Sequence, residues 1–210
     1  MFDVEGLVAE CRQAIRKPEP AETVTEIIGR TISDPSAIEA AVGRADRYCA
    51  LVLYKDADLT VQWNVWPPGI AIGAHDHLMW AVIGIYEGQE DNSLFVLDGE
   101  HLRPQRRIEA TSGTVLTLDA DAIHSVRNPL GRFTASLHVY GGDLDSPRRS
   151  IWDPSGTIRH SMPPRDVGER FMEEYNRQQA HEARPWDPAR AAALSAEIGA
   201  TLRGQGSVAP

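Results

Sequence analysis

Two histidines separated by a single residue are the feature of this sequence most suggestive of chemistry. His75 and His77 lie in the segment GIAIGAHDHLMW, which is built like a β-strand. Side chains two apart on a strand point to the same side of the sheet, so both imidazoles can reach one point. A third histidine, His124, follows on a later predicted strand. Three imidazoles around one point predict an open metal site, which leaves coordination positions for bound molecules.

The spacing of these histidines resembles the two sequence motifs of the cupin superfamily. Five residues separate the glycine and first histidine of the first motif, and ten separate those of the second. The matching residues are Gly69, His75 and His77, and then Gly113, His124 and Asn128. The alternative is a set of core histidines held by hydrogen bonds. Imidazoles crowded into an apolar barrel would then need several partners, whereas one divalent ion satisfies all three nitrogens.

A carboxylate ligand is missing from the first motif. The usual cupin carries a glutamate about five residues past the second histidine, where this chain has Val82, and Glu87 lies too far along. Three neutral imidazoles leave the ion its full double charge. The site is therefore expected to favour an anionic ligand, above all a thiolate bound to the metal.

The segment FTASLHVY predicts a strand with one polar face, formed by Ser136, His138 and Tyr140. A strand facing solvent is the simpler alternative, since all three residue types occur on exposed sheets. The short turn NPLGR joins this strand to the one carrying His124. We therefore expect the two strands to pair, with the polar face turned to the cavity and a hydrogen-bond relay ending at the phenol.

The segments HDHLMWAVIG, AIHSV and SLHVYGG, in this order, resemble the thiol dioxygenases, the cysteine dioxygenase family of cupins. The resemblance is closer to the bacterial branch and covers roughly residues 45 to 152. It implies ferrous iron on three histidines and a Ser-His-Tyr triad beside it. The matching residues are His75, His77 and His124 for iron, and Ser136, His138 and Tyr140 for the triad. The segment LMWAVIG lacks the cysteine that animal enzymes cross-link to the tyrosine, so no thioether is expected at Tyr140.

The same resemblance points to a residue that binds the substrate. Cysteine-specific members hold the substrate carboxylate with an arginine on an early strand, where this chain has Ala50 or a near neighbour. Bacterial enzymes acting on 3-mercaptopropionate have an arginine nine residues past the triad tyrosine, which is Arg149 here. A guanidinium suits bidentate carboxylate binding. The alternative is a solvated surface arginine beside Arg148.

The implied activity is that of a non-haem iron(II) thiol dioxygenase. It would add both atoms of O2 to the sulfur of a small thiol carboxylate and give a sulfinic acid, with 3-mercaptopropionate favoured over cysteine. Tyr140 would donate a hydrogen bond to the substrate carboxylate or to the bound oxygen. The sequence leaves two alternative functions open. One is a three-histidine cupin isomerase, hydrolase or lyase using Zn, Mn or Ni, and the other is a non-catalytic cupin that binds a ligand.

Composition narrows the partners to small molecules. The 210 residues carry a formal net charge of −9, which disfavours nucleic acid and anionic membrane surfaces. The two cysteines, Cys11 and Cys49, fall in different predicted elements, and no long apolar run or signal peptide is recognised. We therefore expect a cytoplasmic, reduced protein, with the oligomeric state open.

Hydrophobic patterning predicts a mainly β cupin barrel, a double-stranded β-helix or jelly roll, within one domain. Residues 1–45 are expected to form helices at 2–16, 20–32 and 36–42, packed on the barrel. Residues 46–152 are expected to form the barrel from nine short strands. Residues 153–210 are expected to be irregular and then helical, at 167–178 and 188–202.

Overall fold

The computed structural model describes residues 2–146, 149–152, 156 and 159–161. It begins with three helices close to the predicted ranges: α1 (Val4–Ala14), α2 (Pro20–Thr31) and α3 (Pro35–Val42). Asp3 and Asp34 cap α1 and α3 by accepting from the backbone N–H groups of Gly6 and Ala37. Proline at the first position starts α2 and α3. The helices predicted at 167–178 and 188–202 lie outside the described residues.

All nine predicted strands are present, and two further short strands follow them. The strands are β1 (Cys49–Lys55), β2 (Thr60–Trp66), β3 (Ala71–Asp76), β4 (Ala81–Glu87), β5 (Gln89–Asp98), β6 (His101–Thr111), β7 (Val115–Leu118), β8 (Ile123–Arg127), β9 (Thr134–Tyr140), β10 (Ser150–Trp152) and β11 (Arg159–Ser161). None of the nine predicted strands covers the residues of β10 and β11. Each has only three residues, too few to show an alternating pattern.

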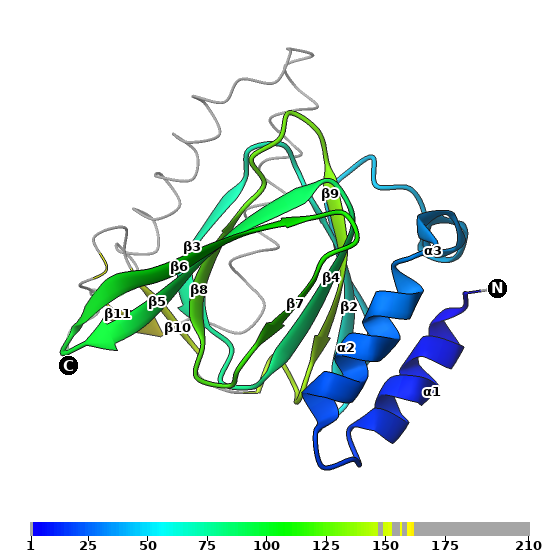
Figure 1. Cartoon of the computed structure of the whole chain (residues 1–210), viewed down its shortest axis with the longest axis horizontal. Helices are drawn as coiled ribbons and strands as arrows, with labels where there is room; N and C mark the ends of the chain where they lie inside the picture. The colour runs from blue at the N-terminus through cyan, green and yellow to red at the C-terminus, as the bar shows by residue number, and fades with distance from the viewer. Residues whose placement is uncertain (1, 147–148, 153–155, 157–158, 162–210) are drawn as a thin grey trace.

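The strands form two antiparallel sheets in the order of a jelly roll (Figure 1). One sheet has the order β1-β2-β9-β4-β7 and the other β11-β10-β3-β8-β5-β6. Strand β2 pairs with β9, β3 with β8, β4 with β7 and β5 with β6. The chain from β2 to β9 is thus one long hairpin wound over two sheets, which is jelly-roll architecture. This order confirms the predicted mainly β cupin-type fold.

The predicted pairing of the His124 strand with the Ser-His-Tyr strand is wrong. Strand β8 pairs with β3 and β5, whereas β9 pairs with β2 and β4, so the two strands belong to different sheets. The connection after β8 crosses from one sheet to the other instead of turning back as a hairpin. Asn128 holds this crossing, since its side-chain N–H groups donate to the carbonyls of Trp66, Pro67 and Arg132.

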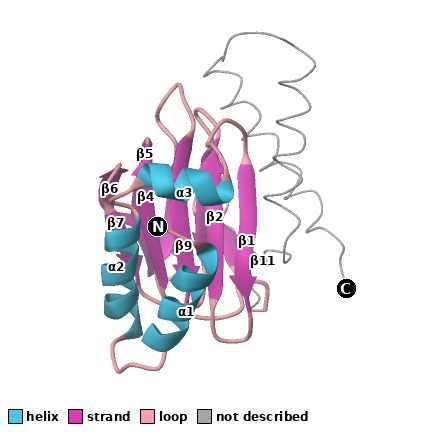
Figure 2. Cartoon of the chain, turned by 90° about the vertical axis from the view of Figure 1, so that its right-hand side faces the viewer, coloured by secondary structure: helices cyan, strands magenta, loops and turns pink. Residues whose placement is uncertain are grey.

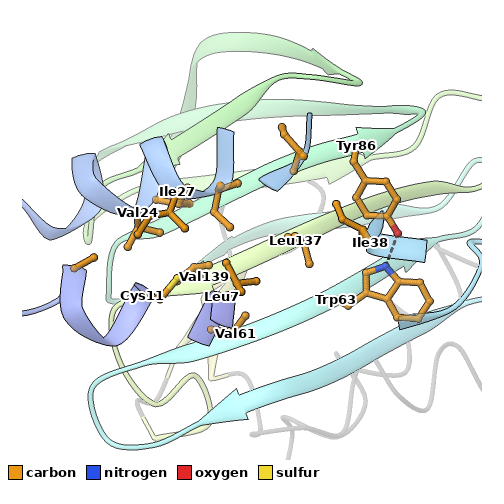
Figure 3. Close-up of a cluster of buried hydrophobic side chains, with 14 of the residues drawn as sticks. Leu7, Cys11, Val24, Ile27, Ile38, Val61, Trp63, Tyr86, Leu137 and Val139 are labelled. Carbon is orange, nitrogen blue, oxygen red and sulfur yellow. Dashed lines mark hydrogen bonds between the residues drawn. The ribbon is translucent and has the colours of Figure 1, made fainter. Parts of the chain in front are cut away.

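The helices cover the outer face of the five-stranded sheet (Figure 2). Apolar residues of α1, α2 and α3 pack there against those of β2, β4 and β9, and Trp63 donates to the hydroxyl of Tyr86 within this core (Figure 3). Helix α2 approaches β4 closely at Gly84, where a Cβ would lie 2.3 Å from a methyl carbon of Ile28. None of the helices in the described part of the chain is long and apolar enough to cross a lipid bilayer.

Candidate metal centre

The structure brings His75, His77 and His124 together inside the barrel. Strand β3 carries His75, His77 follows its end, and pairing with β8 sets His124 directly opposite His75. The three rings are buried, with centroids 4.5 to 5.1 Å apart. Each offers a nitrogen within 4.8 Å of the other two. Two ligand atoms about 2.1 Å from a common ion are at most about 4.2 Å apart, so the three nitrogens lie near the arrangement that one ion requires.

The outer nitrogens of two of these rings are held by the protein. Nδ1 of His75 lies 2.8 Å from the carbonyl oxygen of Gly73, and Nδ1 of His124 lies 2.9 Å from Oδ1 of Asn92. Both acceptors fix a tautomer in which Nδ1 carries the hydrogen and Nε2 presents a lone pair. Nε2 of His124 is buried and has no hydrogen-bond partner among the described residues. A divalent ion would satisfy this nitrogen, so the residues present fit a metal.

Burial keeps the three imidazoles neutral, which is the form that binds a metal. It lowers the pKa of His75 from 6.5 to about 4, against a smaller opposing effect of the Gly73 hydrogen bond. Burial also lowers the pKa values of His77 and His124 well below 6.5, and the neighbouring histidines add to this effect. The cluster is therefore ready to ligate a cation at neutral pH without losing protons first.

The spacing of the first motif places the missing carboxylate at Val82, and the structure shows that this placement is wrong. Val82 packs in the core beneath the helices, so it does not face the histidines. Its neighbour Ala81 pairs with Tyr140 and belongs to the apolar cluster that includes Tyr140, so Ala81 occupies the inward position. The side chain is alanine there, and the metal-type cluster found among the described residues contains histidines alone. The inward position on β4 is therefore occupied by Ala81, which supplies no carboxylate to the histidine cluster.

Strand β9, on the facing wall of the barrel, carries a chain of hydrogen bonds. Oγ of Ser136 lies 2.9 Å from Nε2 of His138, and Nδ1 of His138 lies 2.9 Å from the hydroxyl of Tyr140. All three residues are buried, which excludes the solvent-facing alternative. The ring of Tyr140 contacts that of His77 with centroids 5.1 Å apart, so the chain ends beside the histidine cluster. Burial raises the pKa of Tyr140 above its ordinary value, so the phenol keeps its proton.

Arg149 lies against the same site. It is partly buried, and burial lowers its pKa. Its guanidinium is close enough to lower the pKa values of His75 and His77 and to oppose the rise at Tyr140. A surface arginine pointing to solvent would not act on these buried groups. The guanidinium of Arg149 is therefore within electrostatic range of the histidines and the phenol.

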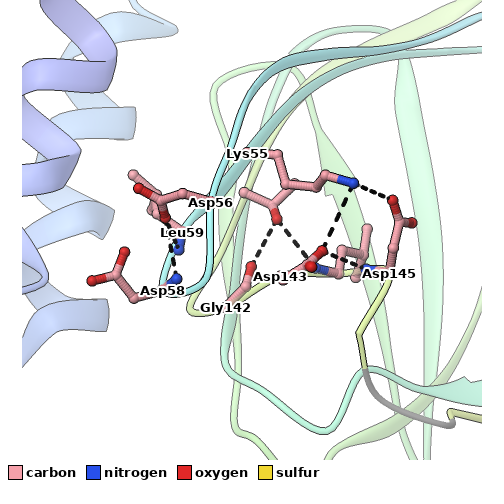
Figure 4. Close-up of polar contacts among 9 residues, drawn as sticks. Lys55, Asp56, Asp58, Leu59, Gly142, Asp143 and Asp145 are labelled. Carbon is pink, nitrogen blue, oxygen red and sulfur yellow. Dashed lines mark hydrogen bonds and ion pairs between the residues drawn. The ribbon is translucent and has the colours of Figure 1, made fainter.

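Contacts are present in the described residues on both sides of Arg149 in the chain. On one side, the N–H of Ser150 donates to Oδ1 of Asp76 at 2.7 Å, and Ile151 of β10 pairs with His75. On the other side, Lys55 on β1 lies 2.5 Å from a carboxylate oxygen of Asp145 (Figure 4). The arginine is therefore fixed to the strand that carries the first histidine.

Several inward polar residues were not predicted from the sequence. Glu90 and Asn92 lie on β5 and are completely buried. Gln62 and Asn64 lie on β2 directly across from His138 and Ser136. The alternation in TVQWNVW could have indicated the β2 pair. The β5 pair was missed because Glu90 lies in the turn-like run YEGQED, although β5 begins already at Gln89.

No known protein-family model matches the chain. Similar solved structures include a cupin family protein of Methanocaldococcus jannaschii, which is 12% identical with a TM-score of 0.40 and covers 47% of this chain and 84% of its own. The protein TT1209 of Thermus thermophilus is 18% identical with a TM-score of 0.39, covering 46% and 84%. A double-stranded β-helix protein of Klebsiella pneumoniae is 13% identical with a TM-score of 0.40, covering 50% and 79%.

Proposed function

We propose that this protein is an iron(II)-dependent thiol dioxygenase that converts a small thiol carboxylate to its sulfinic acid. The observation that supports the proposal is the combination of three features around the buried histidine cluster. These are a donor set of neutral histidines, a hydrogen-bond chain that ends at the Tyr140 phenol, and the guanidinium of Arg149. A binding module does not need the second feature, and a structural metal site would carry a fourth protein ligand.

His75, His77 and His124 would hold iron(II), which would supply the redox chemistry that joins O2 to the sulfur of a thiolate. The thiol supplies the electrons, so no separate reductant enters the balance. The absence of a carboxylate at Ala81 favours an anionic ligand, because the donor set brings no negative charge of its own. A thiolate supplies that charge.

The protein's own residues would orient the substrate. Arg149 would bind the carboxylate with two parallel hydrogen bonds, which a planar guanidinium provides and an ammonium does not. Tyr140, whose ring touches His77, would donate its hydroxyl to the carboxylate or to the oxygen beside it. These roles favour 3-mercaptopropionate over cysteine, since no second fixed cation is available at Ala50 on β1.

Oxygen consumption by the iron-loaded protein tests the proposal. The panel comprises 3-mercaptopropionate, cysteine, cysteamine and mercaptosuccinate, with mass spectrometry of each product. We expect one uptake of O2 for each thiol consumed and a product heavier by both oxygen atoms. A protein that binds zinc, manganese or nickel in preference, and consumes no O2 with any thiol, would instead favour an isomerase, hydrolase or lyase at the same histidines.

Arg149→Gln separates carboxylate binding from the rest of the site. A hydrogen bond to a charged group contributes about 1.5–3 kcal/mol, so kcat/KM for 3-mercaptopropionate should fall about 10- to 150-fold. Cysteamine lacks a carboxylate, so its kcat/KM should change little. Arg107→Gln, at an exposed arginine of β6 that pairs with Asp91, is the matched control. Equal losses on both thiols would show that Arg149 does not bind the carboxylate.

A further inference from the structure

Glu90 extends the hydrogen-bond chain of β9 into the neighbouring sheet. Its side chain is completely buried, and the hydroxyl of Ser136 donates to its Oε1 at 2.7 Å. The same oxygen lies 4.0 Å from Nε2 of His138. The other oxygen, Oε2, has no hydrogen-bond partner among the described residues. Four groups, from Glu90 through Ser136 and His138 to Tyr140, are thus connected in one line.

The number of protons in this line decides what Tyr140 can offer to the cavity. With an ionised Glu90 and a neutral His138, Ser136 must donate to Glu90, and Nε2–H of His138 must donate to Ser136. Nδ1 of His138 is then an acceptor, so the hydroxyl of Tyr140 donates its single hydrogen to it. Tyr140 would present lone pairs alone to the cavity. Such a phenol could not donate to a substrate carboxylate.

One further proton, held by Glu90 and His138 together, reverses this outcome. If His138 carries it, both ring nitrogens donate, one to Ser136 and one to Tyr140. If Glu90 carries it, Glu90 donates to Ser136, Ser136 to Nε2 of His138, and Nδ1–H of His138 to Tyr140. In both arrangements Nδ1 of His138 bears a hydrogen, and the hydroxyl of Tyr140 is free to donate.

We propose that Glu90 is a positioning residue that, together with His138, retains one proton and thereby turns the Tyr140 hydroxyl toward the cavity as a donor. A carboxylate that is fully buried is costly without a compensating charge or proton. His138 is the titratable group that lies beside it in the described part of the chain. The role of this donor in catalysis rests on the proposed function, whereas its direction rests on the hydrogen-bond chain and on the proton that Glu90 and His138 share.

The other charged or titratable groups around His138 come from three directions. His77 at the end of β3 and His124 on β8 both interact with it electrostatically. Tyr140 bonds to it on β9, and Arg149 acts on Tyr140 from the segment before β10. The two histidines are neutral and Arg149 is a cation, so Glu90 is the anionic group that faces His138 among these.

Nitrogen NMR of the full chain, labelled with 15N-histidine and loaded with diamagnetic zinc, tests this inference without turnover. We expect Nδ1 of His138 to give a protonated-type resonance at neutral pH and to lose it as the pH rises and the shared proton leaves. The His138→Asn spectrum assigns the signal. A bare Nδ1 at neutral pH would overturn the inference.

The variant Glu90→Gln distinguishes this role from a purely structural one. Its carboxamide would donate to Ser136, because this leaves one oxygen without a partner instead of two N–H hydrogens. Nδ1 of His138 should then stay protonated and its pH response should vanish. The control Asp91→Asn, at the adjacent carboxylate that pairs with Arg107, should keep the response of the unmodified protein. If the Gln variant fails to fold, Glu90→Met removes the carboxylate at similar volume and should abolish the response in the same way.

A Glu90 variant with the unchanged pH response of His138 would contradict the inference whatever the activity. Because the spectrum needs no turnover, the two proposals can fail separately. A chain that shows the expected spectra and oxidises no thiol would retain the role of Glu90 and lose the dioxygenase. A chain that oxidises thiols but shows a bare Nδ1 of His138 would retain the dioxygenase and lose the role of Glu90.

Discussion

The two facing walls of the barrel differ in whether their buried polar atoms have hydrogen-bond partners. On β3 and β8, the outer nitrogens of His75 and His124 are bonded to the protein, while the inner nitrogen of His124 has no partner in the described part of the chain. On β9, Ser136, His138 and Tyr140 bond to one another in a continuous chain. We call the wall of β3 and β8 incomplete, because its unpartnered nitrogen indicates an external cation. We call the wall of β9 self-satisfied, because its hydrogen bonds orient one terminal group, the hydroxyl of Tyr140.

Removing a ligand from the incomplete wall should have the largest effect. His75→Ala should lose nearly all bound iron and all thiol-dependent O2 uptake, because two imidazoles and solvent hold the ion far more weakly. Since loss of a residue that only supports a ligand already costs about 10- to 100-fold in affinity, loss of the ligand should exceed 100-fold. Metal analysis and the oxygen electrode measure both effects. The exposed His101 on β6 is the control as His101→Ala, and turnover by His75→Ala would overturn the ligand assignment.

The same wall should make the metal-free protein sensitive to acid. The pKa of His75 is about 4 when folded and 6.5 when unfolded, so the unfolded chain binds more protons between these values. The stability contributed by the neutral ring is present above pH 6.5 and is lost as the pH falls toward about 4. This difference corresponds to about 3 kcal/mol of unfolding free energy. Urea unfolding at a series of pH values measures it, and a His75→Gln variant with an undiminished pH dependence would contradict it.

The self-satisfied wall should affect the reaction more than metal binding. Tyr140→Phe removes the terminal hydroxyl and leaves the ring against His77, so iron content should be unchanged. The loss of a hydrogen bond to a charged group should lower kcat/KM about 10- to 150-fold. Tyr86→Phe is the matched control, since that buried hydroxyl accepts from Trp63 on the helix side of the sheet. Iron loss in Tyr140→Phe would contradict this difference between the walls, because it would show that Tyr140 also supports metal binding.

The support behind the incomplete wall should have a smaller effect. Asn92→Ala removes the acceptor for Nδ1 of His124 and should weaken metal binding about 10- to 100-fold while the three ligands remain. Competition with a chelator measures the affinity. Ser93→Ala, at the adjacent position on the other face of β5, should leave it unchanged. An Asn92 variant with full affinity would show that the orientation of His124 has another origin.

The sequence predicted the pair His75 and His77 because its geometry is local, and it predicted that His124 joins them from the spacing of the second cupin motif. His75 and His77 share a face through the strand repeat alone, and Gly69 and Gly113 mark turns where the backbone has positive φ values of 69° and 89°. The polar face of β9 was predictable for the same reason. The alternation in FTASLHVY survives in the structure, with the apolar residues between the triad residues packed beneath the helices.

Apart from His124, the features that depend on pairing between distant strands were not predictable. Strand β10 forms beside β3 because Asp76 and Ile151 find partners across the sheet, and three residues carry no repeat of their own. Glu90 looks like a turn residue in YEGQED, yet β5 begins before it and turns it inward. The opposite sheet positions of β8 and β9 follow from the winding of the long hairpin. The short turn between them gives no indication of it.

We expect three neutral histidines, and no carboxylate of the protein, to bind one catalytic ion. A crystal structure of the protein loaded anaerobically with iron(II) tests it most directly. One ion should lie about 2.0–2.2 Å from a nitrogen of each of His75, His77 and His124, with its remaining positions open to water or thiolate. An ion elsewhere, or one bound by a protein carboxylate in that cavity, would contradict the claim.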